Sequence, residues 1–129
     1  MSEEVPGSDV PEGLENIEWS SIPEVAQELG VRDRDVRGMI SDRSLVAVRR
    51  GGRAPVIPHA FVVDDTDGGK MLVVGLRGSV IQLADAGFDD EEIVAWLFRE
   101  NEELGSTPVQ ALTDQRTHAV RRAAQVLAF

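Results

Sequence analysis

The sequence contains no cysteine and no tyrosine in its 129 residues. The absence of cysteine excludes disulfide frameworks, thiolate catalysis and zinc fingers. No run of about eighteen apolar residues is present, so we expect no membrane-spanning helix and no membrane partner. The first ten residues, MSEEVPGSDV, lack the basic and apolar regions of a signal peptide, and we therefore expect a cytoplasmic protein.

Signals for catalysis and metal binding are also missing. The two histidines, His59 and His118, are far apart, and neither has a nucleophile motif near it. The acidic run after Val63 superficially resembles a calcium loop, but the twelfth position counted from Asp65 is Leu76, where a bidentate glutamate is required. We therefore expect no enzymatic activity, no catalytic residues, no metal site and no cofactor.

The net charge of −10 argues at first against a nucleic-acid partner, because neutralising phosphates requires lysine and arginine. The charge is, however, unevenly distributed. Residues 1–20 contain six acidic residues and no basic ones, whereas residues 21–61 contain seven arginines and five acids, a net charge of +2. Residues 62–98 are again acidic and residues 99–129 are balanced, so 21–61 is the only net basic segment.

Composition and hydrophobic spacing predict three regions. Residues 1–18 combine acids with proline and glycine and have few large apolar side chains, which predicts a disordered acidic tail. Residues 19–74 show the pattern of a helix-turn-helix with a β-wing, and residues 75–129 that of a C-terminal helical domain. The predicted fold class is mainly α with a small β-wing: a winged helix-turn-helix followed by a C-terminal helical bundle.

Capping residues predict where the first two helices begin and end. Ser21 is a plausible N-cap for the first helix, and Gly30 supplies the positive φ that ends it. The second helix is predicted to start from Asp33 as its N-cap and to run to Ser41 or Asp42. Its predicted outward residues are Arg34, Arg37, Gly38 and Ser41.

A hairpin is predicted after the second helix. Residues 45–48 form a β-rich run, residues 49–52 read as a turn, and residues 55–57 as a return strand that Pro55 and Pro58 confine to the edge of a sheet.

Three signals mark helices in the second half. Ser79 is predicted to cap a helix from Val80, and Asp89 with Glu92 forms a capping box. Thr107 followed by Pro108 is typical of a helix start. A last helix is expected within residues 114–127.

The segment EVAQELGVRDRDVRGMISDRSLVAVRRGGRAPVIP resembles the winged helix-turn-helix of the MerR and excisionase type. More specifically, it is similar to a small actinobacterial family of winged helix-turn-helix DNA-binding proteins. This resemblance implies double-stranded DNA as the partner, with the second helix in the major groove. It also implies a Ser/Thr kinase acting on the N-terminal tail, where Ser8 is the candidate phosphorylation site.

The segment LADAGFDDEEIVAWLFRENEELGSTPVQALTDQRTHAVRRAAQVL is similar to the toxin-binding C-terminal domain of the Xre/MbcA/ParS antitoxins. The shared positions are a tryptophan helix, an asparagine, a Leu-Gly pair and a Thr-Pro helix start, here Trp96, Asn101, Leu104, Gly105, Thr107, Pro108 and Leu112. This resemblance implies a protein partner bound through residues 75–129.

The candidate DNA-binding residues all come from the basic segment. They are Arg32, Arg34, Arg37, Ser41, Arg43, Arg49, Arg50 and Arg53. Guanidinium groups on the second helix can reach guanine O6 and N7 or phosphates, and a basic wing suits phosphates or an A·T-rich minor groove. Alternatively, the helical arginines are solvated surface, and the wing arginines protect an edge strand from aggregation.

Gly38 costs about 1 kcal/mol in a helix interior. It would permit close backbone approach, either to the duplex or to the neighbouring wing.

The leading hypothesis is a sequence-specific DNA-binding protein that regulates transcription. The alternative is an antitoxin-like or adaptor module that acts through its C-terminal helices, and a third reading is an excisionase-like architectural protein. A homodimer is compatible with each.

Overall fold

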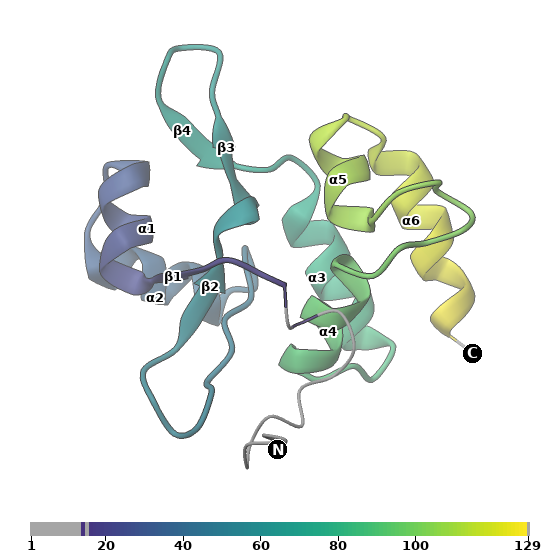
Figure 1. Cartoon of the computed structure of the whole chain (residues 1–129), viewed down its shortest axis with the longest axis horizontal. Coiled ribbons are helices and arrows are strands. Elements are labelled where there is room, and N and C mark those ends of the chain that lie inside the picture. Colours follow the sequence, from purple (N-terminus) through teal and green to yellow (C-terminus); the bar gives the residue numbers. More distant parts are fainter. Residues whose placement is uncertain (1–13, 15, 129) are drawn as a thin grey trace, which may run out of the picture.

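The computed structural model describes Leu14 and residues 16–128, and these form a mainly helical protein with two small antiparallel sheets. The α-helices are α1 (Ile22–Leu29), α2 (Asp33–Ser41), α3 (Leu76–Asp85), α4 (Asp90–Leu97), α5 (Pro108–Thr113) and α6 (Thr117–Gln125). Short 3₁₀ helices, η1 and η2, occupy His59–Phe61 and Val126–Ala128. The strands are β1 (Trp19–Ser21), β2 (Val56–Pro58), β3 (Val62–Asp64) and β4 (Lys70–Leu72). The predicted fold class is confirmed, with the winged helix-turn-helix on one side and helices α3–α6 on the other (Figure 1).

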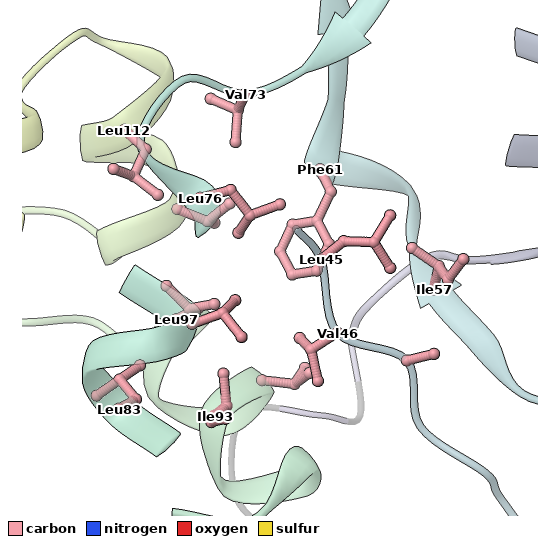
Figure 2. Packing of buried hydrophobic residues seen from close by; sticks show 14 of the residues in the cluster. Leu45, Val46, Ile57, Phe61, Val73, Leu76, Leu83, Ile93, Leu97 and Leu112 are labelled. Carbon is pink, nitrogen blue, oxygen red and sulfur yellow. The ribbon is translucent and has the colours of Figure 1, made fainter. Parts of the chain in front are cut away.

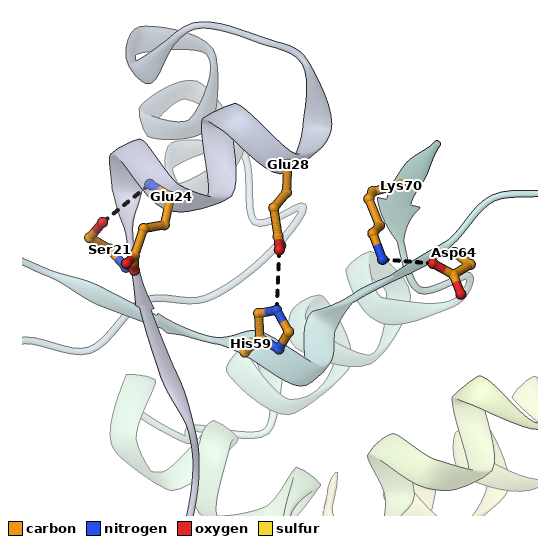
Figure 3. Close-up of polar contacts among 6 residues, drawn as sticks. All are labelled: Ser21, Glu24, Glu28, His59, Asp64 and Lys70. Atoms are coloured by element: carbon orange, nitrogen blue, oxygen red, sulfur yellow. Dashed lines mark hydrogen bonds and ion pairs between the residues drawn. The ribbon is translucent and has the colours of Figure 1, made fainter. Parts of the chain in front are cut away.

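Local capping fixes the ends of α1 as predicted. The Ser21 hydroxyl accepts a hydrogen bond from the Glu24 backbone N–H at 3.2 Å, and the Glu24 carboxylate accepts one from the Ser21 N–H at 2.7 Å (Figure 3). Gly30 ends the helix with φ of 74°, which places Val31 at the start of the turn. The N-cap of α2, predicted at Asp33, is Arg32, because the Asp35 carboxylate accepts the Arg32 N–H at 3.0 Å.

The wing is built differently from the predicted hairpin. Residues 45–47 are buried but form no strand, and Val48 pairs with Val56 in a single antiparallel bridge. On its other side, β2 pairs with β1, with Trp19 opposite Pro58. In this two-stranded sheet β2 is an edge strand, as predicted, and a single bridge, Val48–Val56, lies on its other side. Pro55 precedes β2 and Pro58 ends it, so neither proline removes a ladder hydrogen bond within the strand.

Helices α3–α6 follow the capping signals with one exception. Asp89 and Glu92 form the expected capping box, with bonds of 2.8 and 2.9 Å, and Thr107 accepts from the Gln110 N–H at 3.2 Å. The predicted start of α3 at Val80, with Ser79 as its N-cap, is wrong: the helix begins at Leu76, after Gly75 in the left-handed region. Ser79 lies within α3 and is buried.

One hydrophobic core joins the two halves of the described chain. Leu45 and Phe61 from the first half face Leu76 from the second, in one cluster that also contains Ile57 and Leu97 (Figure 2), and the Phe61 and Phe98 ring centroids are 5.9 Å apart. Leu14 is 1% exposed and belongs to this core, although the sequence predicted it to be part of the disordered tail. The rest of that predicted tail, apart from residues 16–18, lies outside the described residues.

Candidate nucleic-acid interface

Helix α2 presents one polar face to solvent. Val36 is fully buried, and Met39 and Ile40 are partly buried against the core. On the opposite side, four residues are exposed, and these are Arg34, Arg37, Gly38 and Ser41. Arg32 is also exposed at the N-cap. The predicted outward face of this helix is therefore the observed one.

The turn after α2 holds Arg43 in an unusual conformation. Its φ is 67°, in the left-handed region that favours glycine. The Ser44 N–H donates to the Met39 carbonyl at 2.8 Å and the Arg43 N–H to the Ile40 carbonyl at 3.2 Å, the pair of bonds that commonly closes a helix on a left-handed residue. Arg43 is exposed, so this turn projects its side chain from the end of α2.

The residue before Arg43 is fixed by its neighbour. The Asp42 carboxylate accepts hydrogen bonds from the Ser44 hydroxyl at 2.6 Å and the Ser44 N–H at 2.9 Å. These bonds, with a smaller contribution from the positive charge of Arg77, lower the pKa of Asp42 below its ordinary value. Asp42 therefore stays ionised and anchors the turn.

The wing loop, residues 49–53, carries three arginines with different surroundings. Arg50 is partly buried, and its guanidinium lies 5.4 Å from the centre of the Trp19 ring. The Arg49 side chain donates to the Arg53 carbonyl at 3.4 Å across the loop. Arg49 and Arg53 are exposed. Gly51 and Gly52 both have positive φ, which closes the turn between these side chains.

The wing loop and α2 belong to one surface. Ile40 of α2 lines a shallow hollow together with Val48, Arg49 and Pro55 of the wing. A second hollow joins Ser41 and Arg43 to the buried segment that leads into the wing. In Figure 1 the wing loop extends from β2 on the side opposite the β3–β4 hairpin. Both hollows include Ile40 and Ala47, so the C-terminal end of α2, with Ser41 and Arg43, lies next to the wing at Arg49.

Two features of this surface were missed by the sequence analysis, and both come from the second half of the chain. Arg77, in the first turn of α3, is exposed and close enough to Asp42 to affect its pKa. Asp89, Asp90 and Glu91, at the start of α4, line the hollow that contains Arg49. No local signal could have placed these residues here, because they meet α2 and the wing only through the fold.

A second polar cluster lies between α1 and the β3–β4 hairpin. His59 Nε2 is 3.4 Å from the Glu28 carboxylate, and Lys70 Nζ is 2.7 Å from Asp64 Oδ1 (Figure 3). The bond between the latter two lowers the pKa of Asp64 and raises the pKa of Lys70. Lys70 and Asp64 form an ion pair at the surface, and His59 and Glu28 make a hydrogen-bond contact there.

Within Leu14 and residues 16–128, no cluster of histidine, aspartate and glutamate could hold a metal ion. None of the helices in this part of the chain has the length and apolarity needed to cross a membrane. The candidate phosphorylation site, Ser8, lies outside the described residues.

Two family models match consecutive parts of the chain. Residues 8–62 match the model described as "DNA-binding protein Rv2175c, wHTH domain", and residues 73–128 match the "Rv2175c C-terminal domain of unknown function". The expected resemblance to a family of winged helix-turn-helix proteins is thereby confirmed. The finer likenesses to MerR, excisionase and antitoxin proteins stay predictions.

A curated relative and a solved structure agree with these matches. The chain is 36% identical over 120 residues to the DNA-binding protein Rv2175c of Mycobacterium tuberculosis, an alignment that covers 84% of this chain and 79% of the relative. The NMR structure of Rv2175c superposes with a TM-score of 0.73 at 30% identity and covers 100% of both chains. Because both parts of the chain match this family's models and the fold matches its solved structure, the chain belongs to the Rv2175c family.

Proposed function

We propose that this protein binds double-stranded DNA in a sequence-specific manner and acts as a transcriptional regulator rather than an enzyme. In this proposal α2 enters the major groove, and the wing loop contacts the phosphate backbone or the minor groove. The observation that carries it is that the end of α2 adjoins the wing and that five arginines of these two segments are exposed, namely Arg34, Arg37, Arg43, Arg49 and Arg53. The name of the mycobacterial relative, a DNA-binding protein, supports the same proposal.

The roles of these arginines differ by position. Arg34 and Arg37 lie one turn apart on α2, and in this proposal their guanidinium groups read base edges in the major groove. We assign phosphate contacts to Arg32 and Arg43, at the two ends of the helix, and to the wing arginines. Ser41 would donate a hydrogen bond. Base contacts would supply specificity, and phosphate contacts would supply most of the affinity and its salt dependence.

The test is fluorescence anisotropy of the full-length protein against a duplex that it has selected from a random library, repeated over a range of salt concentrations. We expect affinity to fall steeply with salt, by about 0.9 logarithmic units per phosphate contact for each tenfold change in salt. The Arg37→Ala variant should lose about 1–3 kcal/mol of binding free energy and relax the selected sequence. Arg121→Ala is the matched control, because Arg121 is an exposed helical arginine on α6, at the opposite end of the molecule from α2 (Figure 1). A wild-type protein that binds no duplex at low salt would refute the proposal.

A second candidate function, an antitoxin-like or adaptor module, draws on the exposed apolar side chains at the C-terminal end. Val126 is 60% exposed, and Trp96 and Leu127 line a nearby open hollow with Glu100 and Glu103. We propose this surface for a protein partner or for a homodimer. Sedimentation equilibrium of the wild type and of Val126→Ser tests whether a homodimer forms through this surface. If it does, the DNA sequence that the protein selects should contain two half-sites.

The proposal extends to regulation through the N-terminal segment. The first thirteen residues contain four acids and no base, and Ser8 is the candidate substrate of a Ser/Thr kinase. Phosphate on Ser8 would add about −1.5 to −2 charges. Like the acidic side chains of this segment, it would repel the DNA phosphates and weaken binding. Binding of one duplex by unmodified and phosphorylated protein tests this, and equal affinities at low salt would refute it.

A further inference from the structure

Helix α2 has a glycine in its interior, on the face that the proposed function directs at DNA. Gly38 is the sixth of the nine residues of α2, where glycine is less favourable than alanine because it loses more backbone entropy on folding. A glycine at such a position needs a reason, either in the backbone conformation or in what lies next to it.

Nothing within the described chain supplies that reason. Gly38 is not among the glycines with positive φ, so an alanine could adopt its conformation. A β-carbon built on Gly38 meets no heavy atom of the described residues within 4 Å beyond its own helix and chain neighbours. The wing, one of the two candidates for close approach that the sequence left open, is thereby excluded.

The side chains around Gly38 on this face are two arginines and a serine, which can donate hydrogen bonds to DNA. Arg34 and Ser41 are four residues before and three residues after Gly38, so they lie on the same face, and Arg37 is adjacent. All three are exposed, and none has a side-chain hydrogen bond or ion pair to another described residue in the structure. Gly38 is thus a flat position at the centre of an arginine-rimmed surface.

Two other glycines show what the alternatives look like. At Gly75, a β-carbon would lie 2.9 Å from the Thr117 side chain, so packing within the protein requires glycine there. Gly78 also has open space around it, but it lies in the first turn of α3, where the helix penalty is smaller because those N–H groups lack intrahelical partners. Gly38 has neither explanation.

We infer that Gly38 is the point at which the α2 backbone comes closest to a DNA duplex, and that its missing side chain sets the depth of α2 in the major groove. The inference rests on the proposed function and adds a positioning residue to it. A methyl group at this point holds the helix away from the base edges, so the flanking Arg34 and Arg37 reach their partners less well.

The test compares Gly38→Ala with the matched control Gly78→Ala in the full-length protein. Thermal unfolding and anisotropy against the selected duplex are measured for both variants and for Arg37→Ala. We expect Gly38→Ala to raise Tm by about 3 °C, since alanine favours the helix. Its affinity should fall roughly tenfold, because a methyl group is inserted into a close contact, while its salt slope is unchanged because no charge is lost. Gly78→Ala should bind within about twofold of the wild type, since a tenfold change would need a contact worth about 1.4 kcal/mol.

The possible outcomes separate the inference from the proposed function. If Arg37→Ala weakens binding but Gly38→Ala binds as the wild type does, the inference is wrong and the proposed function stands. If Gly38→Ala lowers Tm, glycine is required by the fold itself, and the inference is also wrong. If the wild type binds no duplex, both are wrong.

Discussion

The guanidinium of Arg50 lies over the Trp19 ring, 5.4 Å from its centre. This contact joins the wing loop to β1, two segments that lie about thirty residues apart in sequence but side by side through the pairing of β1 with β2. A cation over an aromatic face contributes about 0.5–1 kcal/mol at exposed sites. Arg50 is therefore partly committed to holding the wing, whereas Arg49 and Arg53 remain exposed for a ligand.

Because of this contact, Trp19 should report on binding at the wing. In a Trp96→Phe background, which leaves Trp19 as the only tryptophan, we expect emission to change as duplex DNA is added and to saturate at the same concentration as the anisotropy. Phosphates near the wing loop shift the Arg50 guanidinium, and this alters the environment of the ring. The Arg50→Ala variant should lose most of the emission change. Constant emission through a saturating titration would show that the wing does not meet DNA.

Arg43 is expected to show a conflict between stability and binding. Glycine is the preferred residue at a left-handed position after a helix, so Arg43→Gly should increase the free energy of unfolding by about 1 kcal/mol. The same variant should bind DNA more weakly and lose about one unit of salt slope, because one phosphate contact disappears. Urea denaturation and anisotropy measure the two effects.

Gln115 provides the control for Arg43. Its φ of 65° and its position after α5 are equivalent, but it lies on the second half of the chain. Gln115→Gly should therefore increase stability by a similar amount and leave DNA binding unchanged. A loss of affinity in both variants would indicate a general effect of added flexibility.

The first turn of α4 should weaken DNA binding through its charge. Asp90 lines the hollow that contains Ser41 and Arg43, and with Glu91 it also lines the one that contains Arg49. A carboxylate about 10 Å from a phosphate in water repels it by about 0.4 kcal/mol, so Asp90→Asn should strengthen binding about twofold at low salt and less at high salt. Asp67→Asn is the control, because Asp67 is exposed in the β3–β4 hairpin, on the side opposite the wing loop (Figure 1), and an equal gain there would point to net charge alone.

Local sequence was sufficient to predict the helix boundaries that depend on residues within four positions. The starts of α1 and α4 were predictable because the capping pairs Ser21–Glu24 and Asp89–Glu92 each form hydrogen bonds within one helical turn. Strand pairing was not predictable in this way. The Trp19–Pro58 register depends on the whole intervening chain, and Leu14 is buried by contacts that its polar neighbours in the sequence do not indicate.

The same distinction applies to the candidate interface. The exposure of Arg34 and Arg37 followed from helical periodicity, since Val36 and Met39 had to face the core. The contact of Arg50 with the Trp19 ring and the position of the acidic residues of α4 beside Arg49 could not be predicted, since both depend on tertiary contacts.

The turn after α2 should have a measurable pH dependence. The lowered pKa of Asp42 means that its bonds from Ser44 stabilise the fold at pH values above the ordinary aspartate pKa. This contribution is lost as pH falls through the lowered pKa of the folded state. In Ser44→Ala the hydroxyl bond is absent, so the pKa of Asp42 should rise towards its ordinary value. Carboxyl-carbon NMR titration of the two proteins measures the shift, and identical titration curves would contradict the role given to the hydroxyl.

Gly75 should be the glycine to which the fold is most sensitive. It has φ of 90° at the N-cap of α3, and a β-carbon there would lie 2.9 Å from Thr117 Cγ2 and 3.0 Å from Leu112 Cδ2. Left-handed strain and overpacking each cost about 1–3 kcal/mol, so we expect Gly75→Ala to lower the free energy of unfolding by about 2–6 kcal/mol. Gly68→Ala separates the two causes, because Gly68 has φ of 89° and open space around it, and it should lose only the strain contribution.

The Gly75 variant also tests how the two halves of the protein are coupled. The core continues from Phe61 to Phe98, and Gly75 joins the last strand of the first half to the first helix of the second. Urea unfolding followed separately by Trp19, in Trp96→Phe, and by Trp96, in Trp19→Phe, should therefore give coincident transitions, and Gly75→Ala should shift both equally. If only the Trp96 transition moves, the halves unfold independently, and the continuous core does not make them one cooperative unit.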